Sequence, residues 1–136
     1  GDILGIKMIG LDVFEKELME LGDAEDIAKQ AIDAATPILV DSLKSEIEKA
    51  ANKGYATGTL KNSIKATKAA VNKQGCFAAV RPTGVDENGV RNGEKFGYLE
   101  NGTSKQMAKP VLRKAIEKSE KACLEAMQKK YDEVTK

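Results

Sequence analysis

A series of apolar residues at helical spacing between residues 23 and 50 constrains the fold more than any other feature of the chain. Apolar residues recur there every three or four positions, the spacing that places side chains on one face of an α-helix. They are Ile27, Ala28, Ala31, Ile32, Ala35, Leu39, Leu43, Ile47 and Ala50. The stripe keeps its phase across Pro37, so we expect one long helix that kinks at this proline. Glu46 and Lys49 are spaced to form a solvated pair of small energy on this helix.

Two more helices are predicted, one on each side of the long helix. Leu11–Leu21 carries a shorter apolar stripe and stops at Gly22. Near the other end of the chain, Pro110 opens a helix over Val111–Val134, because the fixed φ of proline suits a first helical turn. The inner stripe of this helix is expected to contain Leu112, Ala115, Ile116, Ser119, Ala122, Cys123, Ala126, Met127 and Val134. Its outer face mixes lysine and glutamate, which is typical of a solvent-exposed face.

The segments between the helices predict a small antiparallel sheet. Ser63–Val71 and Gly75–Pro82 are expected to form a hairpin, because residues 72–75 supply an Asn and a Gly that tolerate turn conformations. Ile3–Ile9 and residues 96–101 are expected to add strands to this hairpin. The predicted fold class is therefore α+β, with a long kinked helix and a C-terminal helix packed on a small antiparallel β-sheet.

Residues 83–95 are predicted to be a flexible loop within a single domain that spans residues 1–136. The loop contains three glycines and almost no apolar residue to anchor it. Asp86 and Glu87 lack the ligand spacing of a calcium-binding loop, and the glycines lack the sequence of a phosphate-binding loop. We expect the loop to be dispensable for folding but needed for assembly, so its shortening should leave the melting temperature nearly unchanged.

The residue inventory disfavours an enzyme and a dedicated nucleic-acid binder. The chain has no histidine, which removes the commonest general base and the commonest metal ligand. Ser63, Ser104 and Cys76 have no recognisable activating partner, so we expect no catalytic residue, metal or cofactor. The 22 Lys and Arg residues nearly balance the 21 Asp and Glu residues, whereas a nucleic-acid binder shows a basic excess. No apolar run approaches the roughly 18 residues of a membrane-spanning helix. Cys76 and Cys123 are interpreted as core thiols.

Two motifs occur in order along the chain. The first is Thr57-Gly58-x-Leu60-x-x-Ser63-Ile64, which on its own reads as a capped turn before a strand. The second runs from Tyr98 to Ile116 and joins an aromatic segment, a polar turn, a connector and a helix. Its motif residues are Tyr98, Glu100, Gly102, Thr103, Ser104, Lys105, Met107, Ala108, Pro110, Leu112, Arg113 and Ala115.

Both motifs resemble those of the gene-product-ten-like family of small tail-component proteins of long-tailed bacteriophages and prophages. The second motif departs from the family in having Asn101 and Val111 where aromatic residues are usual. The resemblance implies a non-enzymatic virion structural protein at the head–tail junction, which assembles as a ring and docks connector, head-completion and tail-tube proteins. It also implies residence in the host bacterial cytoplasm before assembly. A further implication is that the loop of residues 83–95 orders only against a neighbouring subunit or partner.

A set of residues in the second motif is expected to form the interface with other subunits or partners. These are Tyr98, Glu100, Gly102, Thr103, Lys105, Met107, Pro110 and Arg113. We expect no membrane and no sequence-specific nucleic acid among the partners. The alternative reading is a small nucleic-acid-binding or regulatory α+β domain of a prophage.

Overall fold

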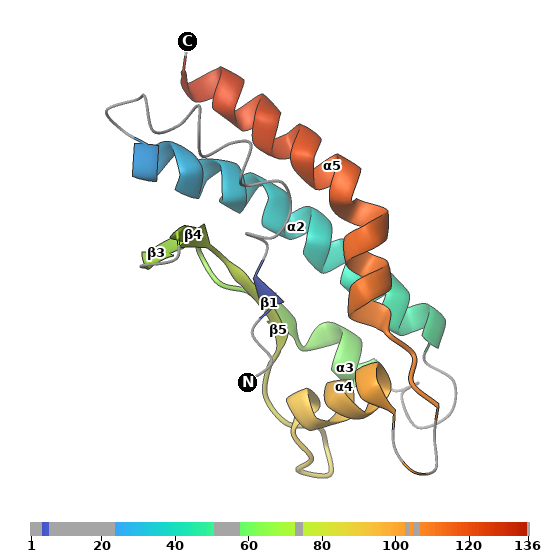
Figure 1. The fold of residues 1–136 in the computed structure, drawn as a ribbon. Helices are drawn as coiled ribbons and strands as arrows, with labels where there is room; N and C mark the ends of the chain where they lie inside the picture. The colour runs from blue at the N-terminus through green and yellow to red at the C-terminus, as the bar shows by residue number, and fades with distance from the viewer. Residues whose placement is uncertain are drawn as a thin grey trace.

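The fold is mixed α+β, as the sequence predicts, and α2 is its central layer (Figure 1). The computed structural model describes residues 4–5, 24–50, 58–72, 75–102, 104 and 107–135. The elements are β1 (Leu4–Gly5), α2 (Ala24–Ala50), α3 (Thr59–Asn62), β2 (Ile64–Ala66), β3 (Ala70–Asn72), β4 (Gly75–Phe77), β5 (Ala79–Pro82), α4 (Asn92–Asn101) and α5 (Val111–Val134). The helix predicted at Leu11–Leu21 lies outside the described residues.

The long helix α2 buries the stripe that the sequence predicts. Every stripe position from Ile27 to Ile47 is buried, and Ala50 is half-buried. The helix continues through Pro37, which is exposed. Proline removes the N–H that would bond to the carbonyl of Asp33. The Thr36 hydroxyl donates to that carbonyl instead, at 3.2 Å, so the carbonyl keeps a partner within the helix.

The C-terminal helix α5 packs antiparallel against α2 over much of its length (Figure 1). Small side chains face each other there. Ser42 donates its hydroxyl to the Ala115 carbonyl at 3.0 Å, and the Cys123 thiol lies 3.7 Å from the Ala35 carbonyl oxygen. The predicted inner stripe of α5 is largely buried, but Ala122 is exposed. The stripe begins instead at Val111, which is only 2% exposed.

Glu46 on α2 pairs with Lys118 on α5 and with Lys49 on α2 itself. The prediction of a solvated pair with Lys49 is wrong, because Glu46 is only 5% exposed. Lys118 on α5 lies 3.1 Å from the Glu46 carboxylate and Lys49 lies 3.2 Å from it. Burial alone would raise the pKa of Glu46, but the hydrogen bonds from Lys118 and Lys49 outweigh it and lower the pKa. Glu46 therefore stays ionised within the helix pair at neutral pH.

The predicted hairpin forms and packs on the side of α2 away from α5 (Figure 1). Strand β2 pairs with β5, with Ala66 opposite Val80, and β3 pairs with β4, with Ala70 opposite Phe77. Between the two ladders, three residues on the first arm face two on the second, which is the pattern of a β-bulge. Of the predicted N-terminal strand, Ile3–Ile9, the structure describes only Leu4 and Gly5, which form β1; Leu4 pairs with Val80.

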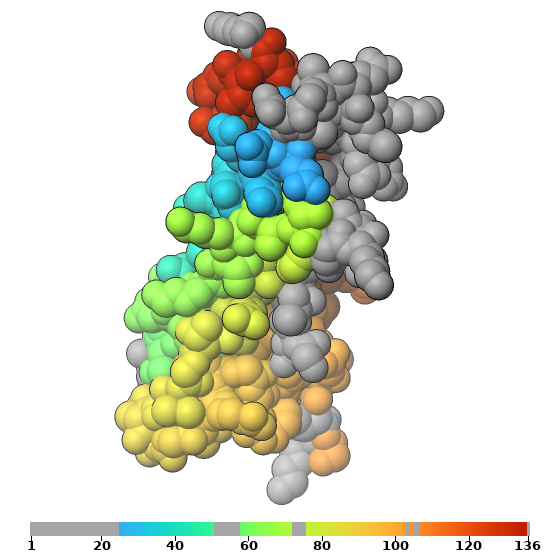
Figure 2. Space-filling view, turned by 90° about the vertical axis from the view of Figure 1, so that its left-hand side faces the viewer, coloured from blue at the N-terminus to red at the C-terminus, as the bar shows by residue number. Residues whose placement is uncertain are grey.

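Residues 96–101 are helical rather than a strand, which corrects the prediction. They belong to α4, whose buried residues are Asn92, Phe96 and Leu99. A spacing of three to four residues matches the helical period and places these side chains on one face. The predicted loop of residues 83–95 is therefore also too long, since its last four residues form the first turn of α4. Figure 2 shows the loop and α4 gathered at one end of the molecule, opposite the start of α2 and the end of α5.

Candidate subunit interface

The second motif forms a corner in which α4 turns through a connector into α5. Glu100 accepts a hydrogen bond at 2.9 Å from the backbone N–H of Leu112, in the first turn of α5. Pro110, which directly precedes α5, carries no side-chain cap of its own. A helix start leaves backbone N–H groups without partners, and a carboxylate there is favoured by the helix dipole. Glu100 therefore caps a helix from a distant position in the chain.

Two further backbone contacts hold this corner. Gly102 ends α4 with φ of 77°, a conformation that favours glycine, and its N–H donates to the Tyr98 carbonyl at 2.8 Å. In the connector, the Lys109 N–H donates to the Leu99 carbonyl at 2.7 Å. Three predicted interface residues thus have structural roles inside the subunit: Glu100, Gly102 and Pro110.

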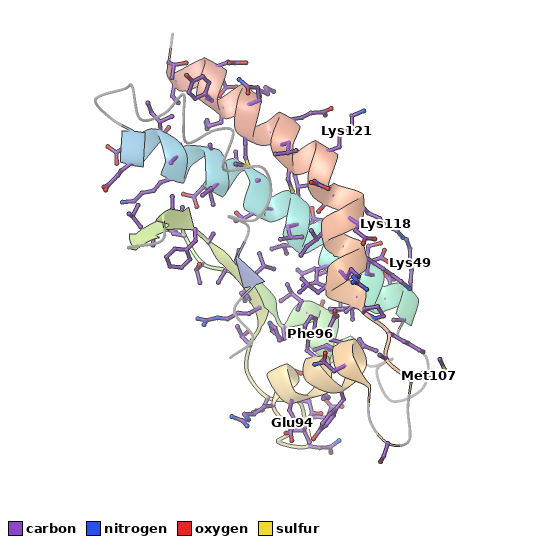
Figure 3. All side chains as sticks on the ribbon, viewed as in Figure 1. Lys49, Glu94, Phe96, Met107, Lys118 and Lys121 are labelled. Atoms are coloured by element: carbon purple, nitrogen blue, oxygen red, sulfur yellow. The ribbon has the colours of Figure 1, made fainter. Side chains whose placement is uncertain are left out.

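The other predicted interface residues that the structure describes face solvent. Met107 is 86% exposed and projects away from the helices (Figure 3). Tyr98 is 44% exposed, with its hydroxyl donating to Glu94 at 2.8 Å. Arg113 is exposed on the first turn of α5. Thr103 and Lys105 lie outside the described residues.

The loop of residues 83–91 is hydrogen-bonded within the subunit, which corrects the expectation that it orders only against a partner. Asp86 accepts bonds from the N–H groups of Asn88 and Val90 at 2.8 and 2.9 Å. Its other oxygen lies 2.9 Å from the Lys95 ammonium, and both side chains are largely covered. The hydrogen bond from Lys95 is the main reason that the pKa of Asp86 is lowered. The loop is thus tied to the first turn of α4.

Asn92 anchors the other side of this loop. It is only 2% exposed, its side-chain amide donates to the Thr83 carbonyl at 2.8 Å, and its N–H donates to the Gly84 carbonyl at 2.9 Å. Thr83 in turn donates its N–H and hydroxyl to the Ser63 carbonyl, at 3.0 and 2.7 Å. Ser63 belongs to the first motif, so this chain of contacts connects the first motif to α4.

The first motif itself is a turn that enters the sheet. Gly58 has φ of 79°, and Leu60 and Ile64 are each only 1% exposed. The Ser63 hydroxyl donates to the Leu60 carbonyl at 2.7 Å. Thr57, the first residue of the motif, lies outside the described residues. Leu60 and Ile64 share one core with Leu99 and Val111 of the second motif. The two motifs, which follow one another in the sequence, therefore also pack into one core.

The corner and the loop expose several large apolar side chains at one end of the molecule. Val85 is 57% exposed and Val90 is 38% exposed on the loop, close in the chain to Tyr98 on α4. Met107 adds the most exposed apolar side chain of the set. A single exposed apolar residue is ordinary, whereas exposed apolar residues that lie together are typical of an interaction surface. We call Val85, Val90, Tyr98 and Met107 the apolar end residues.

The described part of the chain contains no group of three or more His, Cys, Asp or Glu side chains placed to hold a metal ion. Cys123 is buried, as predicted, and Cys76 is half-buried; both are free thiols. Burial raises the pKa of each thiol, so both stay protonated at neutral pH. Within the described ranges, no helix is both long enough and apolar enough to cross a bilayer.

Three features near the corner were not predicted: the buried Glu46 cluster, the Asn92 anchor and the Asp86–Lys95 pair. Each depends on residues that meet only through the fold. Comparison with protein-family models, with curated proteins and with solved structures finds no match to this chain.

Proposed function

We propose that this chain is a non-enzymatic virion structural protein of a phage or prophage that acts at the head–tail junction. In this proposal, identical copies assemble into a ring. The ring docks connector or head-completion proteins on one side and tail-tube proteins on the other. The protein resides in the host bacterial cytoplasm before assembly and in the virion afterwards. No cofactor and no chemical step is part of this role.

The observation that carries the proposal is the exposure of Met107 beside a corner that the hydrogen bonds of Glu100 and Gly102 hold together. The corner matches the family motif, and its inward residues, Glu100 and Gly102, hold α4 and α5 at a set geometry. Met107 is 86% exposed at the outside of this corner. Fully burying a methionine side chain contributes about 1.5–3 kcal/mol, so a partner that covers Met107 would stabilise the complex by up to about that amount. A flexible thioether also adapts to differently shaped partners.

The proposal is tested by deleting the gene in the source strain and examining induced lysates by electron microscopy. DNA-filled heads beside separate, finished tails are expected, and purified protein should then restore whole particles. Tails of abnormal length would assign the chain to tail termination instead. Normal infectious particles after deletion would overturn the proposal.

A pair of variants tests the interface within the same assay. Met107→Asp and Ala122→Asp each add one negative charge at an exposed position, one on the corner and one on the outer side of α5. Both proteins should keep the wild-type melting temperature, because neither position is buried. We expect Met107→Asp to fail in restoring particles and Ala122→Asp to succeed. Equal restoration by both would show that the corner is not the docking surface.

A further inference from the structure

A hollow of about 510 Å³ lies between the end of α2, the connector and the first turns of α5. Four lysines line it together with the buried carboxylate of Glu46 and the apolar side chain of Val111. The lysines are Lys49, Lys109, Lys114 and Lys118. Figure 3 shows Lys49 and Lys118 on the same side of the molecule, near the end of α2 and the start of α5. We call this site the lysine hollow.

The charges of the lysine hollow do not balance. Glu46 accepts from both Lys49 and Lys118, so one carboxylate serves two ammonium groups. Among the residues that the structure describes, the Lys109 ammonium bonds only to the backbone carbonyl of Ala50, at 3.4 Å. The backbone N–H of Lys114 bonds to the Pro110 carbonyl, but its ammonium has no acidic or hydrogen-bonding partner within the described part of the chain. Four positive charges therefore share one negative charge, in a hollow where each ammonium still has N–H donors to offer.

The position of this excess charge on α5 is a second, independent sign of a ligand. A helix start carries partial positive charge, which favours anions and disfavours lysine. The first turn of α5 nevertheless contains no acidic residue, and Lys114 stands there. The one carboxylate that caps this end, Glu100, bonds to the Leu112 N–H and does not line the hollow. By contrast, Lys49 and Lys109 lie at the end of α2, where helix dipoles favour cations.

We propose that the lysine hollow binds a phosphate group carried by a small molecule. A free or monoester phosphate carries about −1.5 to −2 charge at neutral pH and three or more acceptor oxygens. It therefore offsets most of the excess positive charge. Its oxygens can also accept hydrogen bonds from several lysine ammonium groups at once. A carboxylate would offset less and offers two oxygens. None of the apolar end residues lines the hollow, and phosphate binding requires no docking partner, so the inference does not depend on the head–tail role.

The test is an NMR titration of the ¹⁵N-labelled protein with inorganic phosphate at neutral pH, with sodium chloride adjusted to hold the ionic strength constant. Saturable amide shifts are expected around residues 46–50 and 109–118. Lys114→Gln should weaken phosphate binding about tenfold, because it removes a charged hydrogen bond. Lys121→Gln is the matched control: it removes the same charge from an exposed position of α5 that does not line the hollow, and should change the affinity by less than about twofold.

A third variant should change the phosphate affinity in the opposite direction. Glu46→Gln keeps the shape of the side chain but removes the one negative charge of the hollow, so phosphate should bind several-fold more tightly. A purely structural role of the cluster predicts no such gain. Absence of saturable shifts, or an equal loss in Lys114→Gln and Lys121→Gln, would overturn the proposal. So would Lys114-dependent binding of a short DNA duplex without binding of inorganic phosphate, because that result would assign the lysines to a nucleic-acid backbone.

Discussion

Replacing Asn92 with alanine should destabilise the whole subunit, because Asn92 ties the loop of residues 83–91 to the start of α4. The change removes the partly buried hydrogen bond of 2.8 Å to the Thr83 carbonyl. The net contribution of such a bond is about 0.5–1.5 kcal/mol, and the cost rises toward about 3 kcal/mol where the carbonyl is left without a partner. Part of this loss is offset, because the buried Asn92 Oδ1 has no partner among the described residues and is removed as well. We expect a net loss of about 1–2 kcal/mol.

This loss is measurable by urea or thermal unfolding followed by circular dichroism. For a chain of 136 residues, it corresponds to a fall in melting temperature of about 3–6 °C. Asn88→Ala is the matched control, because Asn88 has the same side chain in the same loop but is exposed. The control should change the unfolding free energy by less than about 0.5 kcal/mol. Equal stability of the two variants would refute the anchoring argument and restore the view that the loop is dispensable for folding.

Three further changes test other contacts. Ser119→Ala should stabilise the protein by about 1 kcal/mol or less in urea unfolding, since the only partner found for the buried Ser119 hydroxyl among the described residues is the Cys123 thiol, a weak hydrogen-bonding group. A loss of stability would contradict this. Because the folded-state pKa of Asp86 is lowered, the stability that its carboxylate contributes is present at neutral pH and is lost as the pH falls below about 4. Asp86→Asn should flatten this part of the curve of unfolding free energy against pH. An unchanged curve would argue against the pairing with Lys95. Glu100→Ala should cost about 1 kcal/mol by uncapping α5, whereas Glu100→Gln, which keeps an acceptor for the Leu112 N–H, should cost less; equal losses would remove the capping role.

Local periodicity accounts for the parts of the fold that the sequence predicts well. The stripe of α2 and the bounds of α5 follow from a repeat that a few neighbouring residues define. The hairpin follows from turn residues at 72–75 between two short strand-like segments. The two ends of α5 are marked by Pro110 and by the end of the apolar repeat. All of these signals lie within a few residues of the structure they describe, so they are visible without the fold.

The errors occur where two periods fit the same short segment. Phe96 and Leu99 are three residues apart, which is a helical spacing, but two apolar residues beside an Asn-Gly turn also suggest a short strand. The burial of Asn92 extends the helical spacing and favours a helix over a strand, and it depends on the contact with Thr83 across the loop. The prediction for Glu46 is wrong for a related reason, because it also rests on local spacing alone. Its spacing to Lys49 suggests a solvated pair, but its burial is set by Lys118, which lies 72 residues further along the chain.

The residues of the second motif fall into two groups with different consequences for mutation. Glu100 and Gly102 form bonds within the subunit, so changes there act through stability, and any loss of assembly would follow the loss of folded protein. Met107 makes no described hydrogen bond and is 86% exposed, so a change there should leave the fold intact. In the proposed role, a folded Met107 variant that fails to join heads to tails would therefore locate the docking surface, which a failing Glu100 variant would not do.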